Sequence, residues 1–162
     1  MHTTTVPIAE AAERFLAQRR IAVTGVSRTP GQHGSNAVYQ RLRKSGYEVF
    51  AVNPNATEVE GDPAYPNLAA IDGGVDAVVI ATRPDYAVDT MREAADLGIK
   101  HVWMHRAFGE GSLSEVAGDI GRARGIEVID GGCPLMFGGC SDGAHRMMRR
   151  ILTWTGKVPK RV

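Results

Sequence analysis

The sequence lacks several features that would assign it to a specialised class of protein. Its two cysteines, Cys133 and Cys140, are too few for a disulfide framework or a zinc site. Its apolar runs, such as residues 76–81, stop far short of the ~20 residues that span a bilayer. The first 20 residues lack the apolar centre of a signal peptide. We therefore expect a reduced, cytoplasmic protein with no membrane segment and no metal site.

A strong net charge is also missing. The sequence holds 19 Lys and Arg against 18 Asp and Glu, a net charge of +1, which gives the whole molecule no general attraction to nucleic acid or membranes. Six basic residues nevertheless gather in residues 142–162 beside a single acid. Aromatic residues make up only 6% of the chain, so a nucleic-acid surface is not expected there.

That basic segment instead predicts an amphipathic helix over about 142–155 that docks against a neighbour. Its arginines lie opposite an apolar face, and either a second copy of the chain or an enzyme partner could cover this face. The apolar face consists of Met147, Met148, Ile151, Leu152 and Trp154.

What the sequence does contain is a regular alternation of short apolar runs and amphipathic segments. Strands are expected at 21–27, 47–54, 75–82, 100–105 and 126–132, and helices at about 8–19, 35–46, 83–98, 113–125 and 142–155. Residues 61–71 are expected to be mostly loop, because Pro63 and Pro66 interrupt regular structure. Strands that are apolar throughout indicate a parallel sheet covered on both faces. The sequence therefore predicts one domain over 1–162, a Rossmann-like, doubly wound α/β fold with about five to six strands and three α/β/α layers.

Ligands of such folds bind beyond the carboxyl ends of the strands, and the first of these loops has an unusual sequence. Residues 21–35, "IAVTGVSRTPGQHGS", begin like a dinucleotide-binding turn with Gly25 after a strand. The next expected glycine is Ser27, and the turn is stretched as far as Gly34. A longer loop can still direct backbone N–H groups at a pyrophosphate, and Arg28 can add a charge-assisted contact. The lysine of a P-loop is absent.

The second strand lacks the carboxylate that holds the ribose of NAD. Asn53 stands in its place, followed by Pro54, and Glu58 and Glu60 lie further along in an expected loop. The spacing favours a phosphate-bearing nucleotide other than NAD. A tight turn that binds no ligand is the alternative.

Four segments, in this order, resemble the stand-alone CoA-binding domain proteins, which are similar to the CoA-binding domain of the succinyl-CoA synthetase alpha subunit. The segments are residues 25–54, 65–84, 96–110 and 126–134, and the resemblance covers about residues 15–136. It implies a Rossmann-type domain that binds coenzyme A across the strand ends.

The resemblance also implies where coenzyme A would lie. It places the phosphates at the first loop, the ribose or adenine beside the second strand, and the groove along the turn after the third. The implied residues are Gly25, Val26, Ser27, Arg28, Thr29 and Pro30 of the loop, Asn53 and Pro54, then Thr82, Arg83 and Pro84, and Cys133 at the end of the last strand. His105 stands where the family pattern has glutamine, so the resemblance assigns it no role.

No catalytic set appears at a recognisable spacing. Cys133 is either a reactive thiol near the pantetheine end or a small buried residue in a tight turn. His33 and His105 are either acid–base groups or solvated loop residues. The sequence thus predicts a protein that binds CoA or acyl-CoA without chemistry of its own, as a homo-oligomer or with an enzyme partner. The alternatives are a small NAD(P)-binding oxidoreductase and an interaction module with an empty Rossmann shell.

Overall fold

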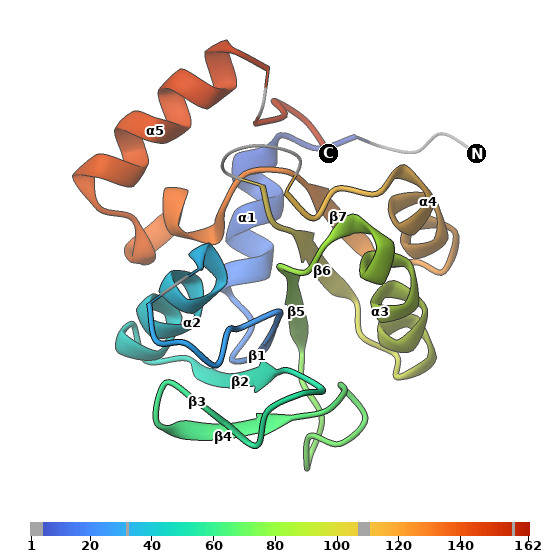
Figure 1. The fold of residues 1–162 in the computed structure, drawn as a ribbon. Helices are drawn as coiled ribbons and strands as arrows, with labels where there is room; N and C mark the ends of the chain where they lie inside the picture. The colour runs from blue at the N-terminus through green and yellow to red at the C-terminus, as the bar shows by residue number, and fades with distance from the viewer. Residues whose placement is uncertain (1–4, 32, 107–110, 157) are drawn as a thin grey trace.

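A seven-stranded sheet forms the centre of the molecule in the computed structural model, which describes residues 5–31, 33–106, 111–156 and 158–162 (Figure 1). Its strands lie in the order β3-β4-β2-β1-β5-β6-β7, and only β3 and β4 pair antiparallel. The chain thus builds outward from β1 in one direction, returns to β5 and continues outward in the other, which confirms the doubly wound α/β fold. The strands are β1 (Arg20–Thr24), β2 (Glu48–Val52), β3 (Glu58–Val59), β4 (Asp62–Tyr65), β5 (Ala77–Ile80), β6 (His101–Met104) and β7 (Glu127–Asp130).

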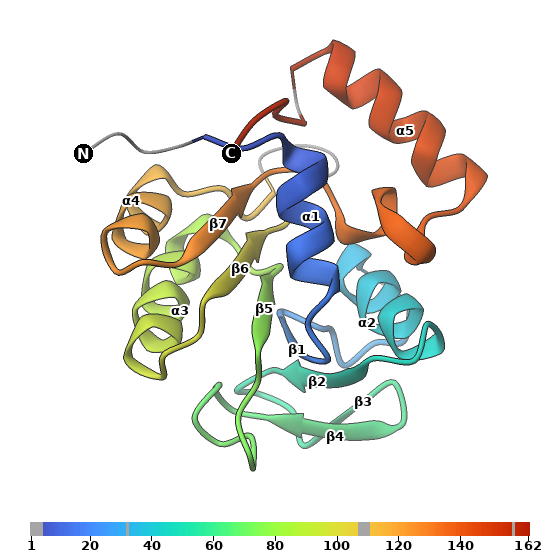
Figure 2. The ribbon, with the colours of Figure 1, turned by 180° about the vertical axis from the view of Figure 1, so that it is seen from behind.

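The apolar strands supply two cores, one on each face of the sheet. Alternate residues of a strand point to opposite faces, so Ile21 and Val23 lie in one core and Ala22 lies in the other. The first core is closed by α1 (Ile8–Leu16) and α2 (Gly34–Lys44), and the second by α3 (Pro84–Asp96) and α4 (Glu115–Ala123). The predicted three-layer arrangement with helices on both faces follows (Figures 1 and 2).

The last helix, α5 (Gly143–Trp154), lies at the outside of the fold (Figures 1 and 2). Two short 3-10 turns, η1 (Pro134–Met136) and η2 (Gly138–Cys140), precede it. The tail that follows α5 returns to the start of the described chain, where Val6 and Val162 exchange two backbone hydrogen bonds of 2.9 Å. Among the described helices, none combines the length and the apolar composition that crossing a membrane requires.

The hairpin of β3 and β4 corrects two expectations, the loop at residues 61–71 and the count of five to six strands. Glu60 and Gly61 have φ values of 51° and 81°, as in the two-residue turns with positive φ that favour hairpins. Pairing of β4 with β2 begins only at Ala64, so the missing N–H of Pro63 removes no hydrogen bond between these two strands. A proline before the paired residues therefore does not exclude a strand.

Candidate ligand-binding site

Two adjacent cavities open at the carboxyl ends of the central strands. The larger has a volume of about 540 Å³ and the second about 520 Å³. Gly25, His33, Thr82 and Tyr86 line both. The cavities lie where the strand order reverses between β1 and β5, which is the usual position of the ligand in a doubly wound sheet.

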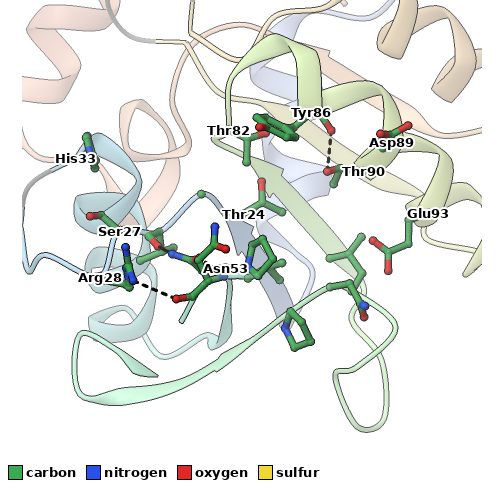
Figure 3. A pocket seen from close by; sticks show the side chains of 18 residues that line it. Thr24, Ser27, Arg28, His33, Asn53, Thr82, Tyr86, Asp89, Thr90 and Glu93 are labelled. Atoms are coloured by element: carbon green, nitrogen blue, oxygen red, sulfur yellow. Dashed lines mark hydrogen bonds between the residues drawn. The ribbon is translucent and has the colours of Figure 1, made fainter. Parts of the chain in front are cut away.

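Opposite walls of the larger cavity carry side chains of opposite charge (Figure 3). Arg28 extends from the loop between β1 and α2, whereas Asp89 and Glu93 belong to α3 on the other side. Asn53 lies between the two walls (Figure 3). A phosphate is therefore favoured on the loop side, and hydroxyl or amino groups on the α3 side.

The structure brings together most of the residues that the sequence assigns to the site. Seven line the larger cavity, and one more lines the second. The seven are Gly25, Val26, Ser27, Arg28, Asn53, Pro54 and Thr82, and the eighth is Arg83. Thr29, Pro30, Pro84 and Cys133 line neither cavity.

Cys133 lies in the hydrophobic core on the side of α1 and α2. It is 3% exposed and belongs to the same buried cluster as Trp103 and Phe137. This position matches the alternative of a small buried residue in a tight turn, and it brings the thiol to neither cavity. Gln32 of the first loop and residues 107–110, which end the resembling segment 96–110, lie outside the described residues.

Gly25 allows the first loop to pack directly against the end of β5. Its φ is +75°, and a Cβ atom there would lie only 2.6 Å from the carbonyl oxygen of Ala81. Its N–H donates to the Val52 carbonyl at 3.1 Å, which joins the ends of β1 and β2. Glycine is therefore required both by the backbone conformation and by the close approach of β5.

The loop is held in shape by Asn36 and Glu60. Asn36 accepts a hydrogen bond from the Ser27 N–H and donates one to the Ser27 carbonyl, both at 3.0 Å. Glu60 accepts from the N–H of Gly31 at 2.8 Å and from the side chains of Asn36 and Gln40 at 2.6 and 2.5 Å. These bonds, that of the Gly31 N–H above all, hold the pKa of the Glu60 carboxyl below its ordinary value. The hairpin thus supplies an ionised anchor for the loop.

Asn53 has a structural role that explains why no acid stands in its place. Its Nδ2 donates to the Val26 carbonyl at 2.9 Å, and its Oδ1 accepts from the Asn55 N–H at 2.8 Å. A carboxylate could make only the second of these bonds, because it has no donor for the Val26 carbonyl. The amide therefore joins the end of β2 to the first loop.

Several backbone donors remain available around this loop. The N–H groups of Val26 and Arg28 make no hydrogen bond within the described part of the chain, and neither do those of Gly34 and Ser35 at the start of α2. The first turn of α2 contains no acidic residue, and the His33 side chain makes no capping hydrogen bond among the described residues. Unpaired N–H groups at a helix start, with a guanidinium beside them, are typical of phosphate-binding sites.

Thr82 offers a second test of whether the site fits a ligand. Its Oγ1 atom is buried and has no hydrogen-bond partner among the described residues. Leaving a hydroxyl in this state is unfavourable, and Thr82 lines both cavities. A polar group of a ligand that passes between the cavities would supply the missing partner.

The second cavity is neutral on its His105 side. Burial lowers the pKa of His105 to about 4, so its imidazole is uncharged at neutral pH. It can exchange hydrogen bonds with a ligand but offers no charge to a phosphate. No group of three or more metal-ligating side chains occurs in the described ranges.

Replacing Glu60 by glutamine is expected to loosen the loop and lower the free energy of unfolding by about 1–2 kcal/mol, because one charged acceptor serves three donors. Folding lowers the pKa of Glu60 from 4.5, so its contribution is present at neutral pH and is lost as the pH falls through the lower, folded value. Urea unfolding of the parent protein and of Glu60→Gln at pH 7 and at pH 3 measures the loss of stability at each pH. Glu58→Gln, an exposed change on the same hairpin, is the matched control. Equal losses in the two variants would show that Glu60 anchors nothing.

Several residues at the site were not predicted from the sequence. Asn36 and Glu60 act through contacts between segments far apart in the chain, and no local pattern marks them. Tyr86, Asp89 and Glu93 reach the cavity because α3 begins directly after β5. The local sequence signal for the β3–β4 hairpin, and so for the position of Glu60, is the Glu60-Gly61 pair, which fits a two-residue hairpin turn.

The fold and the position of the cavities define a doubly wound domain with a ligand site at the strand ends. The profile of a family described as "CoA binding domain" matches residues 19–139. The chain belongs to this family, as its resemblance in sequence implies.

Two curated relatives are longer ligases. The chain is 31% identical over 118 residues to the alpha subunit of Acetate--CoA ligase [ADP-forming] II from Pyrococcus furiosus, which is 72% of this chain and 24% of that protein. It is 36% identical over 84 residues to Acetate--CoA ligase [ADP-forming] II from Archaeoglobus fulgidus, which is 51% of this chain and 12% of that protein. The chain therefore spans a quarter or less of the length of these relatives.

Two solved structures from Pyrococcus share the fold. A hypothetical protein from Pyrococcus horikoshii OT3 is 25% identical with a TM-score of 0.73, covering 94% of this chain and 99% of that one. A conserved hypothetical protein from Pyrococcus furiosus is 31% identical with a TM-score of 0.59, covering 68% and 90%. The first of these structures thus has about the length of this chain, and the second is shorter.

Proposed function

We propose that this chain binds coenzyme A or an acyl-CoA at the carboxyl ends of β1, β2 and β5, and contributes binding rather than chemistry. The observation that carries the proposal is the anchored loop after β1. Glu60 and Asn36 fix its shape, which leaves the N–H groups of Val26 and Arg28 and the Arg28 guanidinium beside a large cavity. Membership of the CoA-binding family supports this choice of ligand.

The residues present fit the parts of coenzyme A. The N–H groups of Val26 and Arg28 and those at the start of α2 would hold phosphate. Tyr86, which is exposed at the cavity, offers an aromatic ring for the base. The pantetheine arm would extend past Thr82 toward the uncharged His105 side of the second cavity, where Thr82 Oγ1 would gain a hydrogen-bond partner.

A separate protein would supply any reaction. The ligases named above contain this region as a small part of longer chains. We therefore propose that the chain presents CoA or acyl-CoA to a catalytic partner. The oxidoreductase alternative gains no support, because both functions of the Asn53 amide are used within the loops and the second strand offers no carboxylate to a ribose.

Coenzyme A is expected to raise the melting temperature of the protein, and NAD⁺ is not. A ligand at 100 times its dissociation constant adds about 2.7 kcal/mol of stability. For a chain of this size, that corresponds to a rise of roughly 5–10 °C. A thermal unfolding scan with each ligand measures the difference. A rise with NAD⁺ and none with coenzyme A would contradict the proposal.

A further inference from the structure

The outer face of α5 exposes a stripe of large apolar side chains. Met147, Ile151 and Trp154 are 63%, 54% and 88% exposed, and their spacing places them along one side of the helix. Leu152 and Met148 point inward and pack against the core below. The single apolar face expected from the sequence is therefore divided between an inner side, which is covered, and an outer side, which is not.

Positive charge borders this outer stripe. A cavity of about 530 Å³ is lined by Arg146, Arg149, Arg150, Thr153, Trp154 and Lys160. None of its four cations forms an ion pair with an acid of the described chain, although Arg149 lies 4.2 Å from the ring centre of Phe137. Like charges three and four residues apart repel one another along a helix. Acidic groups from outside the chain would remove this repulsion.

The composition of α5 is that of a protein interface. Residues Gly143–Trp154 contain three arginines, two methionines and a tryptophan, but no lysine, aspartate or glutamate. Tryptophan, methionine and arginine are enriched at protein interfaces, whereas lysine and the acidic residues are depleted there. A small anion would use the arginines alone and would leave the apolar stripe in water.

A second copy of the chain does not suit this face. Packing α5 against α5 would bring the three arginines of each copy together. Asp142, the single acid of residues 142–162, already accepts hydrogen bonds from Arg41 and His145, each at 2.8 Å.

We propose that the outer face of α5 binds an acidic, apolar segment of a different protein. Apolar side chains of that segment would cover Met147, Ile151 and Trp154, and its carboxylates would face Arg146 and Arg150. The helix is already fixed for this role at both ends, by its Asp142 cap and by the tail that pairs with the start of the chain. The inference does not depend on CoA binding, because these residues line neither cavity at the strand ends.

Tryptophan fluorescence of the full chain tests the proposal. The two tryptophans differ sharply, since Trp103 is fully buried and Trp154 is 88% exposed. The probe is a synthetic helical peptide with leucines at positions i, i+4 and i+7 and glutamates beside them. We expect it to shift the emission to shorter wavelength, and Trp154→Phe to abolish that shift. The double variant R146E/R150E should weaken binding at least about tenfold, because it removes two charge-assisted contacts.

Control probes and variants decide between the occupants. Peptides with lysine in place of glutamate, or serine in place of leucine, should bind at least about tenfold more weakly. Equal binding of either one would overturn the proposal, and so would no shift with the acidic peptide up to about 1 mM.

A shift of the Trp154 emission by inorganic tripolyphosphate would assign the face to small anions. Sedimentation showing a dimer that Trp154→Ala dissociates would assign it to a second copy. R146E/R150E should still bind coenzyme A, so a failure here is distinguishable from a failure of the proposed function.

Discussion

Gly25→Ala is expected to remove a large part of the stability of the protein. The added Cβ would lie 2.6 Å from the carbonyl oxygen of Ala81, and the φ of +75° is unfavourable for alanine. Because the obstructing atoms belong to the backbone of a neighbouring segment, no side-chain rotation can relieve the contact. We expect a loss of roughly 3–5 kcal/mol out of the 5–15 kcal/mol that is typical of a domain. Affinity for coenzyme A should fall with it, since the residue lines both cavities.

Gly46→Ala provides the matched control. Gly46 also has a positive φ, +92°, but a Cβ there would meet no atom of the described residues within 4 Å. Its substitution should therefore cost only the conformational term, about 1–2 kcal/mol. Urea unfolding of the two variants separates the contact from the backbone strain. Equal losses at the two positions would mean that the loop does not pack against the end of β5 as described.

Arg28→Ala is expected to weaken the binding of coenzyme A by about tenfold to a hundredfold with little change in stability. The Arg28 side chain is exposed, and its one hydrogen bond within the described residues is to the Asn55 carbonyl at 3.4 Å, so its removal disturbs no core contact. A charge-assisted bond to phosphate contributes roughly 1.5–3 kcal/mol. The difference between the two proteins should shrink as salt rises, because screening weakens the contact in the parent protein.

Calorimetric titration of coenzyme A at two salt concentrations measures this effect. Arg124→Ala is the control, because Arg124 pairs with Asp96 at 2.9 Å and lines neither cavity. It should leave the affinity unchanged. If Arg28→Ala binds coenzyme A as tightly as the parent, the backbone N–H groups would have to hold the phosphates without the guanidinium.

Much of the fold could be predicted because its signals are local. Buried parallel strands are apolar throughout, as in residues 77–80, and the glycines that end helices, such as Gly46 and Gly98, mark the boundaries between elements. The β3–β4 hairpin was missed because its signal is weak. Its strands are short, and Pro63 obscures the second, so only the turn residues Glu60 and Gly61 indicate it.

The candidate site was predicted best where backbone geometry determines the sequence. Gly25 and the loop that follows could be identified because the ends of parallel strands meet at one edge of the sheet. The contacts of Asn36 and Glu60 depend on how the hairpin packs against α2, which no local pattern encodes. Cys133 is the least supported of the predicted site residues. Its place after the last strand suggested proximity to the ligand, whereas its side chain lies in the core and lines neither cavity.

The most direct test of CoA binding at this site is a map of backbone amide shifts by NMR on titration with coenzyme A. The largest shifts are expected at Val26, Arg28, Gly34 and Ser35, whose N–H groups are unpaired within the described chain, with a further change at Thr82. NAD⁺ at the same concentration should leave the chemical shifts of these amides unchanged. Coenzyme A shifts confined to α5, or no shifts at the loop after β1, would contradict the assignment of this cavity to coenzyme A.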